Sequence, residues 1–498
     1  MDFHIPYPTY KDQYASKYAA LYHALHDAIL QGKLSLNTKL PSSRELAVIY
    51  GISRGTVNQV YDMLIAEGYL QAEVGRGTFV VYRGGKEERR GRSEKPPKLS
   101  DWAMRIRKKD AFAAAIVEER QRELDRTGSS CIDPRKVISF QIGHPYMNEF
   151  PREMWNRCVY EQVRRMTESP QEEAFVAEGH YALREAIAQH LRRTRGIDAP
   201  PERIVIVNGS MQAIALLTQT LVNEGDPVIV ERPGYQGAIR AVMAAGGMPV
   251  PATVDGQGLV PQPWNARLLF VTPSRQFPTG AVLGLERRRQ LLSWAAAQGA
   301  VIVEDDYDSE FRHRGRPIEP LKVLDQEGRV VYIGTFSKTM LQDLRIGYVV
   351  LPEALHDAFV AAKRLFEPHP SGLLEQRSLA AFMASGGYER HLRRMRRVYA
   401  SKFLLLQALL QEQLSTLFEW VESDAGLHLF GWWRGDSRSY AGYAAACRDA
   451  GVVWSDAGFY GLPAERSGAC FGFSHLAEAE MRRGVALMRQ VGEENRLI

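Results

Sequence analysis

Apolar residues recur at helical spacing in three runs near the start of the chain. The runs cover residues 16–33, 42–51 and 53–68, and each ends at or next to a glycine, a common helix stop. In the second run, Ser42 and Glu45 have the spacing of a capping box, in which each side chain bonds the other residue's backbone. The pattern therefore predicts three consecutive helices.

A β-hairpin is predicted directly after the third helix. The segments "YLQAE", "VGRG" and "TFVVY" have the pattern of a strand, a Gly-rich turn and a second strand. Three helices followed by a hairpin are typical of a winged helix-turn-helix. We therefore expect residues 1–82 to form a DNA-binding domain.

The chain changes composition after the hairpin. Residues 83–100 are mostly charged residues, glycine and proline, which cannot build a hydrophobic core. Residues 110–126 have a helix-like pattern that either extends this linker or packs on the next domain. We expect a partly helical linker over residues 83–136.

Short apolar runs alternate with helical runs from residue 137 to the end of the chain. Apolar strands separated by helices are typical of a mostly parallel sheet covered on both faces, in which ligands bind at the carboxyl ends of the strands. We therefore expect residues 137–498 to form an α/β domain, which makes the protein multidomain. The strand-like runs are residues 203–208, 227–231, 267–273, 300–306 and 330–336.

Composition limits the partners and the location of the protein. The chain has 498 residues, with 63 Lys and Arg against 58 Asp and Glu, and its formal net charge of +5 is too small for a uniformly basic surface. Any DNA contact must therefore be local.

The N-terminus lacks the apolar core of a secretory signal and no segment is long and apolar enough to span a bilayer, so we expect a cytoplasmic protein without a membrane partner. The four cysteines form no C-x-x-C pair, so we expect neither a metal site nor a disulfide framework.

The third helix has the residues that a recognition helix needs at its N-terminus. Short polar and basic side chains there can contact base edges in the major groove while the apolar face packs behind them. Arg44, in the preceding helix, is placed to contact the DNA backbone or a guanine, and Arg76, at the hairpin tip, to enter a minor groove. The candidates on the third helix are Ser53, Arg54, Thr56 and Asn58.

A second group of residues has the chemistry of a pyridoxal 5'-phosphate (PLP) site. A lysine that forms a Schiff base must be kept partly unprotonated. The cofactor also needs a carboxylate for its ring nitrogen, a donor to its phenolic oxygen, an aromatic face and a phosphate cradle. The candidates are Lys338 for the Schiff base, Asp305 for the ring nitrogen, Tyr307 for the phenolic oxygen, Tyr235 for stacking, and Ser210, Met211, Thr335, Ser337 and Arg345 for the phosphate.

The segment "LPSSRELAVIYGISRGTVNQVYDMLIAEGYLQAEVGRGTFV" resembles the GntR-type winged helix domain over nearly its whole length. This resemblance implies that the chain binds double-stranded DNA. It also implies contacts to DNA from Arg44, Ser53, Arg54, Thr56 and Gly75.

The segments "TPSRQFPTG", "EDDYDSEFR" and "GTFSKTMLQDLRIGYVVLP" resemble fold-type I aminotransferases, in the form found in MocR/GabR family regulators. The resemblance implies an aminotransferase-like PLP domain in a head-to-tail homodimer. It implies that Lys338 is the Schiff-base lysine, that Asp305 contacts the ring nitrogen and Tyr307 the phenolic oxygen, and that Arg345 binds the phosphate.

Two positions depart from the aminotransferase pattern. Phe277 stands where these enzymes commonly have an asparagine that bonds the phenolic oxygen, which argues against efficient catalysis. Cys470 stands where an arginine that grips the substrate carboxylate is expected, and a thiol cannot make that bidentate contact. The nearest arginine in the sequence is Arg466, which would need a shifted alignment.

Three functions are compatible with these patterns. The first is a transcriptional regulator that senses PLP itself, or an amine or amino acid through an aldimine at Lys338. The second is a PLP-dependent aminotransferase with an attached DNA-binding domain, and the third is a DNA-binding protein whose large domain only dimerises. The residue set around Lys338 argues against the third function and Cys470 against the second, so we expect a regulator with at most residual half-transamination.

Overall fold

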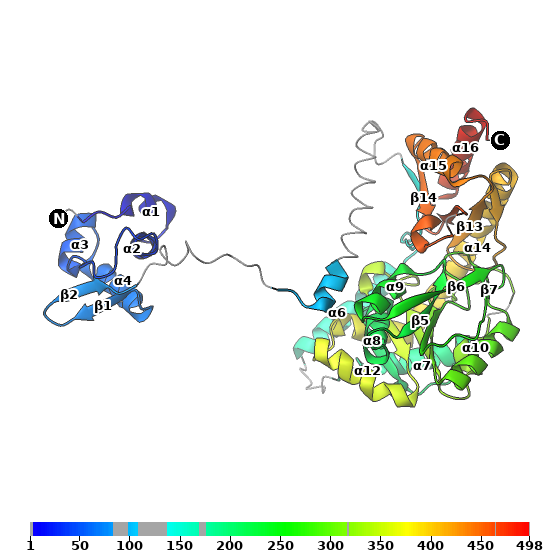
Figure 1. Cartoon of the computed structure of the whole chain (residues 1–498), viewed down its shortest axis with the longest axis horizontal. Helices are drawn as coiled ribbons and strands as arrows, with labels where there is room; N and C mark the ends of the chain where they lie inside the picture. The colour runs from blue at the N-terminus through cyan, green and yellow to red at the C-terminus, as the bar shows by residue number, and fades with distance from the viewer. Residues whose placement is uncertain are drawn as a thin grey trace. The chain divides into compact units, whose positions relative to one another are not determined.

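The computed structural model of the chain, drawn in Figure 1, falls into two units, Met1–Lys98 and Leu99–Ile498. Most of the predicted linker, together with Cys131 and the helix-like residues 110–126, lies outside the described residues. Inside that linker, residues 101–107 are helical, and Arg105 of this helix donates to the Ala244 carbonyl at 3.4 Å. This piece of the chain therefore packs on the second unit. The described residues are 3–82, 98–107, 137–168, 176–315, 318–463 and 465–497.

Helices and one hairpin build the first unit. The three predicted helices and the hairpin are confirmed, but the prediction missed a fourth helix at the N-terminus, which is too short to show a clear apolar period and begins beside Pro6. The buried core includes Leu21, Leu25, Val57 and Leu64. The elements are α1 (Tyr7–Gln13), α2 (Lys17–Leu30), α3 (Ser43–Tyr50), α4 (Arg54–Ala66), β1 (Leu70–Glu73) and β2 (Gly77–Val80).

Side-chain caps determine where α3 and α4 begin. Ser42 Oγ accepts from the Glu45 amide at 3.3 Å, and Glu45 Oε2 accepts from the Ser42 amide at 2.8 Å, which confirms the predicted capping box. Gly51 ends α3 with φ of 63°, a left-handed conformation that favours glycine. Ser53 Oγ accepts from the Thr56 amide at 3.1 Å and so starts α4.

An eight-stranded sheet forms the centre of the second unit. Its order is β4-β11-β10-β9-β8-β5-β6-β7. The strands from β10 through β6 pair in parallel, while β11 is antiparallel to both of its neighbours and β7 is antiparallel to β6. All five predicted strands are confirmed. The strands are β4 (Ile204–Val207), β5 (Pro227–Arg232), β6 (Met248–Asp255), β7 (Gly258–Leu259), β8 (Leu268–Val271), β9 (Val301–Asp306), β10 (Val330–Thr335) and β11 (Gly347–Val350).

Both faces of this sheet are covered, as predicted. Alternate residues of a strand enter different hydrophobic clusters, because successive side chains point to opposite faces. Val205 and Val207 of β4 pack with α8, α9 and α12, while Ile204 and Ile206 pack with α7, α13 and α14. The helices in this part of the chain are α6 (Arg152–Glu168), α7 (Tyr181–Arg195), α8 (Ser210–Leu221), α9 (Gln236–Ala244), α10 (Leu285–Gln298), α11 (Leu321–Leu324), α12 (Glu353–Phe366), α13 (Leu373–Ala384) and α14 (Gly387–Leu414).

A second, five-stranded sheet lies at the C-terminal end of the chain, with the order β12-β13-β15-β14-β3. Its first strand in sequence, β3, pairs with β14, more than three hundred residues later, so sequence periodicity did not predict it. Its elements are β3 (Ile138–Phe140), β12 (Phe418–Trp420), β13 (His428–Trp433), α15 (Ser437–Asp449), β14 (Val452–Asp456), β15 (Gly468–Gly472) and α16 (Glu478–Glu494), and short 3-10 turns occur at Pro201–Arg203, Gln342–Leu344 and Ala457–Tyr460.

None of the helices in the described part of the chain combines the length and the hydrophobicity needed to span a bilayer.

Candidate functional site

Several of the predicted cofactor residues meet at one edge of the eight-stranded sheet. The register between β9 and β10 pairs Asp305 with Ile333, and that between β10 and β11 pairs Thr335 with Gly347. Gly347 in turn pairs with Val207, at the end of β4. The ends of β9 and β10 therefore lie side by side, and the end of β4 lies at the same edge on the other side of β11.

Electrostatic interactions also link candidates at or after the ends of β5, β9 and β10. Tyr235 interacts with both Asp305 and Arg345. Tyr307 interacts with Asp305, and Lys338 interacts with Arg345. The structure therefore brings these five residues into one site.

The two adjacent carboxylates at the end of β9 have different surroundings. Asp306 Oδ2 accepts from Arg195 Nη2 at 2.7 Å, from the Tyr332 hydroxyl at 2.7 Å and from Ser309 Oγ at 2.8 Å. Asp305 points to the opposite face, and within the described structure its Oδ1 is buried without a hydrogen-bond partner. Asp306 is therefore structural, and Asp305 is the carboxylate left available to a ligand.

Burial makes the Asp305 carboxylate costly to ionise. Desolvation raises its pKa to about 7, and the charges of Asp306 and Asp308 add to the effect. Asp305 also lines a small cavity of about 20 Å³ together with Tyr235 and Glu231. A cationic N–H group placed against Asp305 would lower this pKa and satisfy the buried oxygen.

Lys338 lies in the turn after β10. Its Nζ donates to the carbonyl of Gly143 at 3.3 Å, and Gly143 belongs to the segment that follows β3. Burial lowers the pKa of Lys338. The charge of Asp308 partly offsets this decrease, and the charge of Arg345 adds to it. A lowered pKa increases the fraction of the neutral amine, which is the form that reacts with an aldehyde.

The phosphate candidates surround the N-terminus of α8. Ser210 and Met211 occupy its first turn, where amides have no partner within the helix, and no side chain caps this end. A Cβ added to Gly209 would come within 2.6 Å of Arg345 Nη2, so the guanidinium lies directly against this turn. Ser337 Oγ is buried and has no hydrogen-bond partner in the described residues.

These surroundings fit PLP. A buried acceptor at Asp305, a buried hydroxyl at Ser337 and an uncapped helix N-terminus beside Arg345 match the ring nitrogen and the phosphate. Lys338 has the lowered pKa that a covalent bond to the cofactor carbonyl needs.

Phe277 forms the centre of an aromatic cluster at this site. Its ring meets Tyr307 at a centroid distance of 5.7 Å and Tyr235 at 6.1 Å, both nearly perpendicular. It also meets Tyr460 at 4.8 Å. The phenylalanine that replaces the expected asparagine therefore packs among rings and offers no side-chain hydrogen bond.

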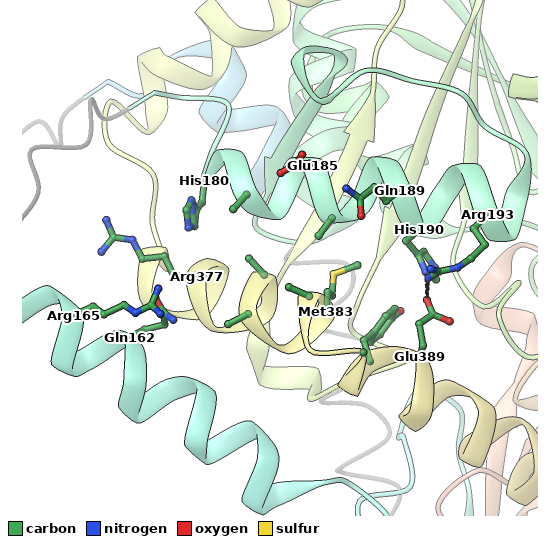
Figure 2. A pocket seen from close by; sticks show the side chains of 17 residues that line it. Gln162, Arg165, His180, Glu185, Gln189, His190, Arg193, Arg377, Met383 and Glu389 are labelled. Atoms are coloured by element: carbon green, nitrogen blue, oxygen red, sulfur yellow. Dashed lines mark hydrogen bonds and ion pairs between the residues drawn. The ribbon is translucent and has the colours of Figure 1, made fainter.

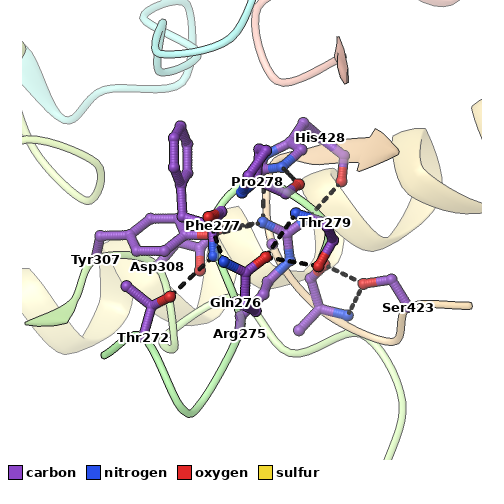
Figure 3. Close-up of polar contacts among 12 residues, drawn as sticks. Thr272, Arg275, Gln276, Phe277, Pro278, Thr279, Tyr307, Asp308, Ser423 and His428 are labelled. Carbon is purple, nitrogen blue, oxygen red and sulfur yellow. Dashed lines mark hydrogen bonds and ion pairs between the residues drawn. The ribbon is translucent and has the colours of Figure 1, made fainter. Parts of the chain in front are cut away.

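Sequence reasoning did not single out Arg275, Asp308 and His428, which form a buried network beside Tyr307 (Figure 3). Arg275 Nη1 donates to the Tyr307 hydroxyl and to Asp308 Oδ2, both at 3.1 Å, and Nη2 donates to the His428 carbonyl at 2.6 Å. Arg275 and Asp308 lie within two segments, "TPSRQFPTG" and "EDDYDSEFR", that carry the resemblance. Their pairing across the fold was not readable from either segment.

Cys470 and Arg466 have different positions relative to the site. Cys470 is fully buried in β15 and interacts electrostatically with Arg275. Arg466 is half-exposed and stacks its guanidinium over Trp432 at 4.0 Å, with Glu419 at 3.6 Å. Arg466 therefore does not take the place of the missing arginine.

The predicted DNA contacts gather at the N-termini of α3 and α4. Arg44, Ser53, Arg54 and Asn58 are exposed, and Thr56 is partly buried. Arg54 Nε donates to Ser43 Oγ at 3.4 Å, which joins the two helix starts. These residues form one surface of the first unit.

The hairpin tip contributes two further candidates. Gly75 has φ of 78° in the turn between β1 and β2, where glycine is favoured. Arg76 beside it is exposed and pairs with Glu73 at 2.8 Å. Exposed pairs of this kind are weak, so Arg76 can exchange Glu73 for a phosphate at little cost.

A larger cavity, of about 450 Å³, lies elsewhere on the second unit between α6, α7, α13 and the start of α14 (Figure 2). His190 and Arg193 of α7 both contact Glu389 at its rim. None of the predicted site residues lines it.

Comparisons with known proteins match both units. Residues 135–467 match the family "Aminotransferase class I and II", and residues 17–80 match "Bacterial regulatory proteins, gntR family". The probable rhizopine catabolism regulatory protein MocR of Rhizobium meliloti is 36% identical over 93% of this chain and 90% of its own length. The HTH-type pyridoxine biosynthesis transcriptional regulator PdxR of Corynebacterium glutamicum is 30% identical over 80% of each chain. The chain is similar in fold to Pyrococcus horikoshii kynurenine aminotransferase, with a TM-score of 0.67 at 23% identity over 82% of this chain and 98% of that one.

Substitutions of the two adjacent aspartates are expected to act in opposite directions. Asp306→Asn leaves Arg195 without its counter-ion, so we expect the free energy of unfolding to fall by about 3–5 kcal/mol. Asp305→Asn removes a carboxylate that is costly to ionise, so in the cofactor-free protein we expect this free energy to rise, and to rise more at pH 8 than at pH 5. Urea denaturation at both pH values measures the two effects.

The sign for Asp305 follows from its pKa. The folded value of about 7 exceeds the unfolded value of about 3.9, so the wild type loses stability as the pH rises from about 4 to about 7. Asparagine does not titrate and escapes this loss. If Asp305→Asn destabilised the cofactor-free protein at pH 8 as much as Asp306→Asn does, the assignment of the two carboxylates would be wrong.

Proposed function

The chain belongs to the aminotransferase class I and II family and is a transcriptional regulator of the MocR/GabR type with a gntR-family DNA-binding domain. From this premise we propose that the protein binds PLP at Lys338 and uses this site to sense a small molecule. The observation that carries the proposal is the set of buried polar atoms around Lys338, since Asp305 Oδ1 and Ser337 Oγ have no partner in the described structure. Buried polar groups are normally hydrogen-bonded, so these two atoms are suited to a ligand.

Each residue has a distinct task in this proposal. The cofactor supplies a carbonyl carbon that reacts with amines. Lys338 would hold that carbon, Asp305 would accept from the ring N–H, and Tyr235 would pack against the ring. The Tyr307 hydroxyl already accepts from Arg275 at 3.1 Å, so its own proton is available to the phenolic oxygen. Ser210, Met211, Thr335, Ser337 and Arg345 bind the phosphate.

We further propose how the DNA-binding domain contacts its operator. Ser53, Arg54, Thr56 and Asn58 at the start of α4 reach base edges in the major groove, with Arg44 on the adjacent backbone. Gly75 and Arg76 bring the hairpin tip to the minor groove. Because chromosomal DNA is the partner, the proposal retains the cytoplasmic location expected from the sequence.

The signal is either PLP itself or an amine or amino acid that reacts at the Lys338 site. A ligand shifts a conformational equilibrium only by binding one state more tightly, so the signal must favour one arrangement of the DNA-binding domains. One relative is named for rhizopine catabolism and the other for pyridoxine biosynthesis, so the names of the relatives do not single out one kind of signal.

A homodimer, arranged head to tail, completes the proposal. One face of α6 exposes Tyr160, Val163 and Met166 at helical spacing, with 73%, 41% and 43% of their surfaces accessible. Exposed apolar stripes of this kind commonly mark protein interfaces.

Replacing Lys338 is expected to abolish covalent cofactor binding. The wild type mixed with PLP should show a visible absorbance band, and borohydride reduction should attach the cofactor to the peptide that contains Lys338. Lys338→Arg keeps the charge but cannot form the bond, so both signals should vanish.

Lys322→Arg is the matched control, since Lys322 is also mostly buried but donates to the Val330 carbonyl. This variant should keep both signals. A trapped cofactor on another peptide of the wild type, or a band that survives in Lys338→Arg, would contradict the assignment.

Replacing Arg54 is expected to weaken operator binding. Loss of a base or phosphate contact costs about 1–3 kcal/mol, so a gel-shift titration with the promoter region of its own gene should show about 5- to 150-fold weaker binding for Arg54→Ala. Lys11→Ala removes an exposed charge from α1 and should change binding far less. Equal binding by the wild type and Arg54→Ala would exclude the recognition-helix role.

Sedimentation velocity tests the homodimer. The wild type should sediment with twice the mass of one chain, and Tyr160→Lys with Met166→Lys should shift it toward one chain, because charges would enter an apolar interface. A wild type that sediments as a single chain at micromolar concentration would exclude the proposed assembly.

A further inference from the structure

A pair of opposite charges from elsewhere in the chain lies near the position where the carboxylate-binding arginine is expected. Cys470 of β15 is uncharged and fully buried. Arg275, from the loop after β8, donates to the carbonyl of His428 in β13, two residues before Phe430, which pairs with Cys470 in the neighbouring strand. A guanidinium is therefore present beside this position, although β15 does not provide it.

The charge of Arg275 is already neutralised. Its Nη1 lies 3.1 Å from Asp308 Oδ2, and the two side chains are only 2% and 3% exposed. The remaining Nη contacts go to the Tyr307 hydroxyl and to the carbonyl and ring of His428. A buried ion pair of this kind is net neutral and offers little to an incoming anion.

Backbone packing holds Arg275 in this position. Gly426 has φ of 87°, and a Cβ added there would come within 2.3 Å of Arg275 Nε and 2.4 Å of Cζ. The guanidinium therefore lies flat against the Gly426 backbone, which covers Nε, a buried donor with no hydrogen-bond partner in the described residues. It cannot turn toward a ligand without breaking its contacts to Asp308 and His428.

No other described group around Cys470 supplies an unpaired positive charge. Burial and the charge of Arg275 hold the pKa of His428 well below its ordinary value, and its Nε2 donates to the Pro278 carbonyl at 2.9 Å. His428 is thus neutral, with Nδ1 accepting from Arg275. Arg466 stacks on Trp432 at the surface.

We propose that the Arg275–Asp308 pair determines the ligand class of this site, so that it accepts primary amines without a carboxylate and rejects amino acids. A carboxylate placed beside Cys470 would lose its water without gaining an unpaired counter-ion. This inference rests on the proposed function of Lys338. In the exchange, the ligand nitrogen forms a bond to the cofactor carbon while the bond to Lys338 breaks, and Lys338 leaves as a free amine with no net oxidation.

Pairs of ligands that differ by one carboxylate test the inference on the PLP-loaded, full-length protein. The pairs are ethylamine with alanine, and propylamine with 4-aminobutyrate. Dissociation constants come from the change in cofactor absorbance, and thermal shifts give a second readout. In the wild type we expect each amine to bind about tenfold or more tightly than its carboxylate partner, the size of a charged hydrogen bond that is not made.

Asp308→Asn keeps the shape of the side chain but frees the charge of Arg275. In this variant the affinity for alanine and 4-aminobutyrate should rise about tenfold or more, while that for the amines should change little. Asp343→Asn, an exposed position, is the control and should behave as the wild type. The comparison in the wild type needs no variant, so it decides the question even if Asp308→Asn folds poorly.

The outcomes separate this inference from the proposed function. Absence of the cofactor band in the wild type would mean that the Lys338 proposal fails, and the inference with it. A normal band with equal or tighter binding of the amino acids would overturn the ligand class alone. A normal band with no binding of any of the four ligands would also overturn it and leave PLP itself as the signal. If Asp308→Asn still preferred amines over amino acids to the same degree, the ion pair would not be the cause of that preference.

Discussion

The carboxylate of Asp306, which accepts three hydrogen bonds on one oxygen, is the interaction on which the geometry of this site depends. Its donors come from α7, β10 and the loop after β9, through Arg195, Tyr332 and Ser309. Arg195 and Asp306 are almost completely buried, and a buried charge requires such compensation. Because neighbouring side chains of a strand point to opposite faces, this anchoring leaves Asp305 facing the site.

The three aspartates between Asp305 and Asp308 have three different roles. Asp306 holds the fold together, Asp305 is left for a ligand, and Asp308 pairs with Arg275 at 3.1 Å. Burial alone would penalise all three carboxylates, so each must find its own compensation. Asp306 and Asp308 find it in arginines from distant parts of the chain, and only Asp305 Oδ1 finds none among the described residues.

Local patterns predicted the elements well and their long-range partners poorly. The capping box at Ser42, the five strands of the large sheet and the turn around Lys338 were all visible in the sequence, because they depend on residues a few positions apart. The short helix α1, the antiparallel insertion of β11 and the five-stranded sheet were not predicted. β11 and β3 pair with strands far away in sequence, and the spacing of apolar residues along the chain does not predict such pairing.

The sequence by itself determined that the chain has a winged helix domain and an α/β domain with a lysine, a carboxylate and a phosphate cradle after its strands. It also identified Cys470 as a position without the expected charge. Only the tertiary structure decided that Arg275 stands beside that thiol and that Asp308 neutralises it. The reason is that Arg275 contacts Asp308 and His428, which lie 33 and 153 residues away along the chain. Which residues pair with a buried charge depends on burial and on distance across the fold, and residue type alone does not determine it.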